Sequence, residues 1–140
     1  MIGGHAEDEM ATTPPIELAE AAPEVRAVYE DIMATRNVAD VNNFWKHLAQ
    51  DPATLRRTWD SLKQVMAPGA LDPLTKELIY LAVSVTNGCT YCIASHTAAA
   101  RRAGMTGQQF GELMAVVGMA NETNSLATGY RVPIDAAFER

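Results

Sequence analysis

Residues 72–104 read DPLTKELIYLAVSVTNGCTYCIASHTAAARRAG and contain both cysteines of the 140-residue chain. Asp72 followed by proline is a typical helix start, because aspartate caps free backbone N–H groups and proline fits the first turn. The run from Leu78 to Val85 is apolar on all sides, a pattern that a buried helix and a buried strand share. The cap and the length of the whole segment favour a helix.

A second helix is predicted from Cys89 to Arg102. Gly88 breaks the apolar run, alanines fill much of the next segment, and Gly104 ends it. The CxxC sequence of Cys89 and Cys92 therefore opens a helix, where unpaired backbone N–H groups and the positive end of the helix dipole favour a thiolate. A reversible disulfide between cysteines at this spacing is geometrically natural.

The rest of the chain continues the helical pattern. Apolar residues at spacings of three and four predict helices after Pro23, over 42–50 and after Pro52. A capping box at 106–109 starts another helix, and a last segment is expected around 126–130. No alternating run or hairpin turn predicts a strand. We therefore expect an all-α fold, a compact orthogonal bundle of about six to seven helices.

Composition and charge indicate the kind of protein. Residues 1–15 lack a periodic apolar pattern, so we expect a flexible N-terminal arm there and a single domain over 16–140. The formal net charge of −6 argues against a nucleic-acid partner, because a phosphate backbone would be repelled. No apolar run reaches the roughly 20 residues of a membrane span, and no basic and then apolar leader opens the chain. We expect a cytoplasmic protein.

Three reactive side chains share one face of the CxxC helix. His96 follows Cys92 by four residues and Cys89 by seven, so at about 100° per residue the three fall within about 60°. An imidazole there can take a thiol proton or, as a cation, stabilise the thiolate. Glu77 lies at the edge of the preceding apolar stripe, and a partly buried carboxylate needs a partner such as this histidine. Proximity to the helix start favours Cys89 as the nucleophile, whereas proximity to His96 favours Cys92.

These side chains also permit other interpretations. Cys89, Cys92 and His96 could bind zinc with Glu77 as a fourth ligand. Structural zinc sites usually take ligands from several elements, however, and no second ligand pair completes a closed site. Glu77 could also be a solvated residue paired with Lys76. We rank zinc below redox chemistry.

The pattern Glu77, eleven residues, Cys89, two residues, Cys92, three residues and His96 resembles the signature of the AhpD-like alkylhydroperoxidases, in the carboxymuconolactone decarboxylase superfamily. The resemblance is most specific over 72–104. It implies an AhpD-like helical bundle that forms a homo-oligomer, such as a trimer or hexamer. It also implies a hydroperoxide substrate, a thiol reductant or peroxiredoxin-like protein partner, and no metal or organic cofactor.

The resemblance implies a role for each residue of the pattern. Cys92 resembles the peroxidatic cysteine, which becomes a sulfenic acid, and Cys89 resembles the resolving cysteine, which condenses with it to a disulfide. Glu77 and His96 resemble the members of the proton relay. The pattern departs from the best-known signature at Tyr91, where that signature has a second histidine. Tyrosine is a poor base near neutral pH.

The leading hypothesis is an antioxidant enzyme that reduces alkyl hydroperoxides or exchanges disulfides through the CxxC pair. Two alternative functions fit parts of the pattern. The decarboxylase branch of the superfamily acts on a cyclic lactone by acid–base chemistry and does not depend on a cysteine pair, so the two cysteines count against it. A non-catalytic metal-binding or scaffold protein would use the thiols as ligands.

Overall fold

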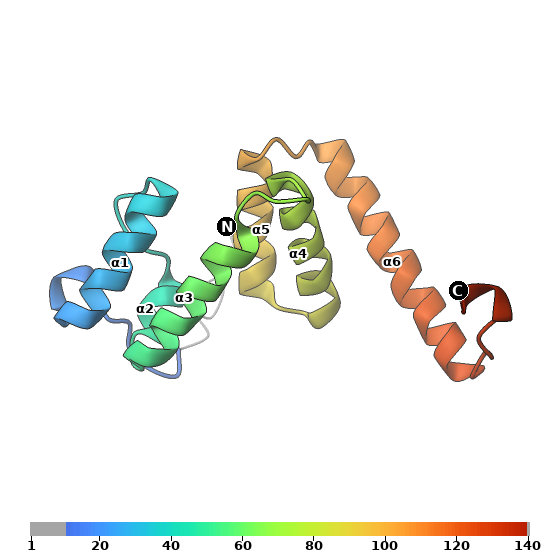
Figure 1. The fold of residues 1–140 in the computed structure, drawn as a ribbon, viewed down its shortest axis with the longest axis horizontal. Helices are drawn as coiled ribbons and strands as arrows, with labels where there is room; N and C mark the ends of the chain where they lie inside the picture. Colours follow the sequence, from blue (N-terminus) through green and yellow to red (C-terminus); the bar gives the residue numbers. More distant parts are fainter. Residues whose placement is uncertain (1–10, 140) are drawn as a thin grey trace, which may run out of the picture. The chain divides into compact units, whose positions relative to one another are not determined.

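The computed structural model describes residues 11–139, which contain helices and no strand. In this part of the chain six α-helices follow one another, with a 3-10 helix near each end (Figure 1). This confirms the predicted all-α fold and the predicted number of helices. The bounds are η1 Leu18–Glu20, α1 Pro23–Arg36, α2 Asn43–Leu48, α3 Pro52–Met66, α4 Pro73–Asn87, α5 Thr90–Arg102, α6 Gly107–Gly129 and η2 Ala136–Phe138.

Two of the helices begin at the caps that the sequence predicts. The side chain of Asp72 accepts a hydrogen bond from the backbone N–H of Thr75, and Pro73 occupies the first turn of α4. Thr106 and Gln109 form the predicted capping box at the start of α6. Both caps satisfy N–H groups that the helix itself leaves unpaired. The ambiguous apolar run after Asp72 is therefore a helix.

Helix α6 is longer than the sequence predicts. We expected a separate segment around 126–130, but α6 continues without a break to Gly129. The stretch 119–125 is mostly polar, which hides the helical periodicity of apolar residues there. Its hydroxyl groups are nevertheless accommodated, since Thr123 and Ser125 donate to backbone carbonyls four residues earlier. The prediction of a separate last segment is wrong for this reason.

The described residues fall into two compact units that divide between Val65 and Met66. In the first unit, α1, α2 and α3 enclose a core whose largest fully buried side chains include two tryptophans. Of the predicted arm over 1–15, residues 1–10 lie outside the described residues, and Gln50 donates a hydrogen bond to the carbonyl of Pro14. The single domain over 16–140 stays a prediction.

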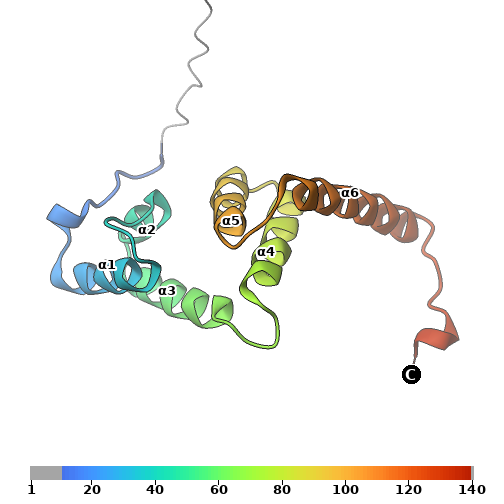
Figure 2. The ribbon, with the colours of Figure 1, turned by 90° about the horizontal axis from the view of Figure 1, so that it is seen from above.

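The second unit is built on α4, α5 and α6. Helices α4 and α5 form a hairpin and lie side by side in both views (Figure 2). Leu81 of α4 and Ala100 of α5 are fully buried, and Met105 covers the same core at the start of α6. No helix within residues 11–139 is long and apolar enough to cross a membrane. The hairpin is the element that carries the candidate site.

Candidate active site

The turn between α4 and α5 delivers the first cysteine directly to the start of α5. Gly88 adopts a left-handed conformation with φ of 68°, which glycine adopts without strain. The N–H of Gly88 donates to the carbonyl of Val85, and the N–H of Cys89 donates to the carbonyl of Ser84. This is the bonding pattern of a Schellman motif, which closes a helix within two residues. The short turn fixes where α5 begins.

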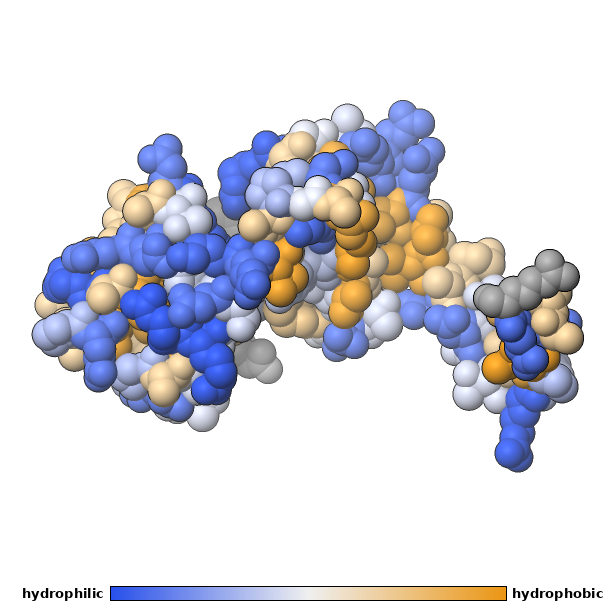
Figure 3. All heavy atoms as spheres, viewed as in Figure 1, coloured by the Kyte–Doolittle hydropathy of each residue, from blue (hydrophilic) through white to orange (hydrophobic). Residues whose placement is uncertain are grey.

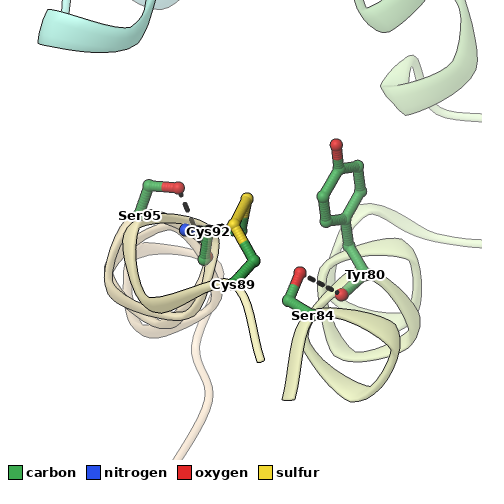
Figure 4. The surroundings of a disulfide bond; sticks show 5 residues. All are labelled: Tyr80, Ser84, Cys89, Cys92 and Ser95. Atoms are coloured by element: carbon green, nitrogen blue, oxygen red, sulfur yellow. Dashed lines mark hydrogen bonds between the residues drawn. A yellow bond between two sulfur atoms is a disulfide. The ribbon is translucent and has the colours of Figure 1, made fainter. Parts of the chain in front are cut away.

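Cys89 and Cys92 are joined by a disulfide across the first turn of α5 (Figure 4). Their Cα atoms are 5.3 Å apart. Cys89 is the N-cap residue, and its sulfur accepts a hydrogen bond from the backbone N–H of Cys92 at 3.3 Å. Both cysteines are partly buried. The sulfur of Cys89 thus takes the place of a capping oxygen, and a negative charge at this position would be favoured by the helix start.

Glu77 of α4 and His96 of α5 meet across the hairpin. Oε2 of the carboxylate lies 2.7 Å from Nδ1 of the imidazole, and the two side chains are only 17% and 15% exposed. The interpretation of Glu77 as a solvated residue is therefore wrong. The neighbouring Lys76 donates to the backbone carbonyl of Ala67. A carboxylate on Nδ1 occupies that nitrogen and leaves Nε2 as the nitrogen that can exchange protons with other groups.

The sequence analysis missed one residue of this site, Tyr80. Its ring stacks on the imidazole of His96, with the ring centroids 3.7 Å apart and the planes 21° from parallel. Tyr80 follows Glu77 by three residues, so both lie on the same face of α4. Its side chain and the disulfide project to the same side of the α4–α5 hairpin (Figure 4). The available signal was this spacing, which the apolar character of the surrounding run concealed.

Two serine hydroxyls near the disulfide donate hydrogen bonds to backbone carbonyls. The hydroxyl of the buried Ser84 donates to the carbonyl of Tyr80 at 2.8 Å, and that of Ser95 donates to the carbonyl of Cys92 at 3.3 Å (Figure 4). Such bonds to the preceding turn are a common way for serine to be accommodated inside a helix.

The side chains considered as zinc ligands do not converge on one point. Within residues 11–139, no group of three or more His, Cys, Asp or Glu side chains is placed to hold a metal ion. Glu77 is directed to Nδ1 of His96, and the two sulfurs are bonded to each other. The arrangement is instead a disulfide at the start of α5 and a carboxylate–imidazole pair between α4 and α5. That this chemistry needs no cofactor stays a prediction.

Comparison with known proteins gives a consistent result. Residues 52–134 match the carboxymuconolactone decarboxylase family. The crystal structure of an "Alkylhydroperoxidase AhpD core" from Rhodospirillum rubrum is 54% identical, with a TM-score of 0.90 over 94% of this chain and 98% of that chain. An "Alkyl hydroperoxide reductase AhpD" from Anaeromyxobacter sp. (strain K) is 34% identical over 133 residues, which cover 86% of this chain and 68% of that protein.

A third relative matches over a shorter stretch. An "Uncharacterized protein 4 in cox locus" from Paracoccus denitrificans is 48% identical over 50 residues, and the matched stretch covers 36% of this chain and 45% of that protein.

The chain belongs to the carboxymuconolactone decarboxylase family. Within that family it is AhpD-like, since the AhpD core structure and the AhpD relative both match it over most of its length. The resemblance inferred from the spacing of Glu77, the cysteines and His96 is confirmed.

Proposed function

We propose that this protein reduces alkyl hydroperoxides through its CxxC pair. The observation that carries the proposal is the 2.7 Å contact between Glu77 and His96 on the hairpin whose turn holds the Cys89–Cys92 disulfide. A peroxidase of this kind needs a sulfur nucleophile, a second thiol to resolve it and a group that moves protons. The AhpD-like family provides the reaction class, and these four residues provide the groups.

In the proposed reaction, Cys92 is the nucleophile. His96 takes the proton of the Cys92 thiol, and the thiolate attacks the terminal oxygen of the hydroperoxide. An S–O bond forms as the O–O bond breaks, and the departing alkoxide receives the proton back from His96 and leaves as an alcohol. Glu77 contacts Nδ1 of the imidazole and offsets its charge while it carries the proton. Cys92 is left as a sulfenic acid.

The second half of the reaction forms the disulfide. The Cys89 thiol loses its proton and its sulfur attacks the sulfur of the sulfenic acid, so that an S–S bond forms and hydroxide leaves with that proton as water. Two thiols have then supplied two electrons, and one hydroperoxide has become an alcohol and water. A dithiol reductant restores both thiols by exchange. When the reduced pair meets a peroxiredoxin-like partner, the partner's disulfide is the oxidant in place of the hydroperoxide.

We further propose that the protein assembles with copies of itself through α4 and α6. Apolar surface gathers over α4 and the first half of α6 (Figure 3). A contiguous apolar surface of this kind marks an interaction site more often than a free surface. The exposed apolar side chains of this surface include Ile79 (49%) and Val83 (54%) on α4, and Val116 (65%) and Met119 (58%) on α6.

A cytoplasmic location and the lack of a nucleic-acid partner stay predictions from the sequence.

The experiment that tests the reaction counts thiols. The protein is reduced, freed of reductant and mixed with one equivalent of cumene hydroperoxide, and free thiols are followed in wild type and in the Cys89→Ser and Cys92→Ser variants. We expect wild type to lose both thiols, Cys89→Ser to accumulate a dimedone-reactive sulfenic acid, and Cys92→Ser to react no faster than an ordinary thiol. Ser125→Ala, which removes an exposed hydroxyl from α6, should behave as wild type.

The other outcomes each lead to a different conclusion. A sulfenic acid in Cys92→Ser and not in Cys89→Ser would reverse the two roles, as the capping position of Cys89 would favour. Thiols that persist with the hydroperoxide but are lost to oxidised glutathione would assign the chain to disulfide exchange. Thiols that persist with both oxidants would reject redox function and favour the lactone chemistry of the decarboxylase branch.

A further inference from the structure

We infer that Tyr80 is a positioning residue that holds the imidazole of His96 in the orientation the proton transfer needs. The inference rests on the function proposed above and adds a fifth residue to its site. The carrying observation is the stacked contact between the two rings, with 3.7 Å between their centroids and 21° between their planes. Contacts between aromatic rings add to stability beyond the area they bury.

The hydrogen bond to Glu77 alone does not fix the ring. A single contact between Nδ1 and Oε2 restrains one edge of the imidazole but does not by itself set the plane of the ring. A flat partner against one face of the ring sets that plane. Tyr80 and Glu77 therefore constrain different motions of the same imidazole, and the direction of its Nε2 is defined only when both are present.

Helix geometry explains why both constraints come from α4. Glu77 and Tyr80 are three residues apart and lie on one face, directly opposite the face of α5 that carries His96. The backbone at Tyr80 is itself held, because its carbonyl accepts the hydroxyl hydrogen bond of the buried Ser84. The tyrosine ring is thus part of the packed hairpin, and its position does not depend on a mobile loop.

The stack uses the ring of Tyr80 and not its hydroxyl group, which gives the inference a sharp test. Phenylalanine preserves the flat face, whereas leucine fills space without one. We expect Tyr80→Phe to react with cumene hydroperoxide within about two-fold of wild type and Tyr80→Leu to react about 3- to 10-fold more slowly, the range that one aromatic contact supports. Circular dichroism and thermal unfolding of both variants verify that the helices remain.

The decisive comparison repeats the leucine substitution in a His96→Ala background. If Tyr80 acts through His96, the change Tyr80→Leu has no further effect on the residual rate once the imidazole is gone. An equal loss in both backgrounds would show that Tyr80 merely supports the fold, and the inference would be withdrawn. It would be withdrawn as well if Tyr80→Leu kept the wild-type rate, or if Tyr80→Phe lost as much as Tyr80→Leu.

A measurement without turnover separates this inference from the proposed function. The ring current of Tyr80 should displace the imidazole proton resonances of His96 in the NMR spectrum of wild type and of Tyr80→Phe, and the displacement should vanish in Tyr80→Leu. The chain has three histidines, so the His96→Ala spectrum assigns the resonance. A displaced resonance in a protein that ignores hydroperoxide would keep the stack and reject the peroxidase. An undisplaced resonance in an active protein would reject the inference alone.

Discussion

The carboxylate of Glu77 lies 2.7 Å from Nδ1 of His96, and the contact joins two consecutive helices at a point that solvent hardly reaches. In such surroundings an unpaired carboxylate would be costly, and the imidazole supplies the partner that burial requires. The same contact occupies Nδ1, so that Nε2 is the imidazole nitrogen available for the proposed proton transfer. One pairing therefore accounts both for how the hairpin tolerates two polar groups and for how the proposed proton transfer is directed.

Replacing the carboxylate tests this pairing. The change Glu77→Gln keeps the shape of the side chain but removes the charge that offsets a protonated imidazole. We expect the rate of thiol loss with cumene hydroperoxide to fall by about 10- to 100-fold, at or below the roughly 100-fold lower end of what a general acid–base group contributes, because His96 itself remains. Stopped-flow thiol counting measures it. Glu112→Gln, which alters an exposed carboxylate of α6, is the matched control and should leave the rate unchanged, while an unchanged rate in Glu77→Gln would contradict the relay.

The apolar surface of α4 and α6 predicts an assembly that a charge should disrupt. Val83 is 54% exposed in the single chain, and a glutamate there would be buried without a partner if copies of the chain meet on this face. We expect Val83→Glu to lower the mass measured by light scattering to that of one chain. Gln64→Glu adds a similar charge to an exposed position of α3 and should leave the assembly intact. A wild-type protein that is already monomeric would refute the assembly.

Replacing glycine by alanine should have opposite effects on stability in the turn before the cysteines and inside α6. Gly88 has φ of 68°, so Gly88→Ala should lower the free energy of unfolding by about 1 to 2 kcal/mol, although the added Cβ would touch nothing. Gly111 lies inside α6, and Gly111→Ala should raise the free energy of unfolding by about 0.5 to 1 kcal/mol. Urea denaturation compares the two. Equal changes of the same sign would show that backbone conformation is not the cause.

In the first unit, Asp31 predicts a stability that depends on pH. Its carboxylate accepts hydrogen bonds from Lys63 at 2.7 Å and from Trp59 at 2.6 Å, and these bonds lower the pKa of Asp31 below its usual value. Because the unfolded chain then binds the proton more readily, the carboxylate stabilises the fold above the ordinary aspartate pKa of about 3.9, and this contribution is lost as the pH falls through the lowered pKa.

The variant Asp31→Asn should therefore unfold at a lower urea concentration than wild type at pH 7, and the difference should shrink below pH about 4. Asp60→Asn is the control, since Asp60 lies on the surface and its contact with Arg56 is a long one of 3.5 Å. A difference between wild type and Asp31→Asn that stays constant down to pH about 2 would contradict the linkage.

Local signals explain how much of the fold the sequence predicts. The caps at Asp72 and Thr106 were readable because each depends only on residues a few positions apart. The continuity of α6 could not be predicted, because the middle of the helix is polar and shows no apolar periodicity. Its Thr123 and Ser125 hydroxyls donate to backbone carbonyls of the preceding turn. The half-exposed Val83 shows a second limit, since an apolar residue does not reveal whether its own chain or another covers it.

The same distinction applies to the candidate site. The shared face of the two cysteines and His96 follows from spacing along one helix, and Glu77 could be proposed because its stripe predicted partial burial. The stack on Tyr80 depends on how α4 and α5 pack, which no spacing within one helix specifies. A tyrosine in an apolar run is ordinarily counted with the core, and only the packed hairpin shows it lying on the imidazole of His96.

The short spacing of Cys89 and Cys92 has a consequence for the proposed redox cycle. The disulfide joins residues only three positions apart, within the first turn of α5. Helix α5 is also packed against α4 through their shared apolar core. Cutting this bond sets no distant part of the chain free, because a small ring contributes the least to restraining the unfolded chain. In the proposed reaction, opening and closing this bond would therefore leave the packing of α4 against α5 in place, so that the scaffold need not refold between cycles.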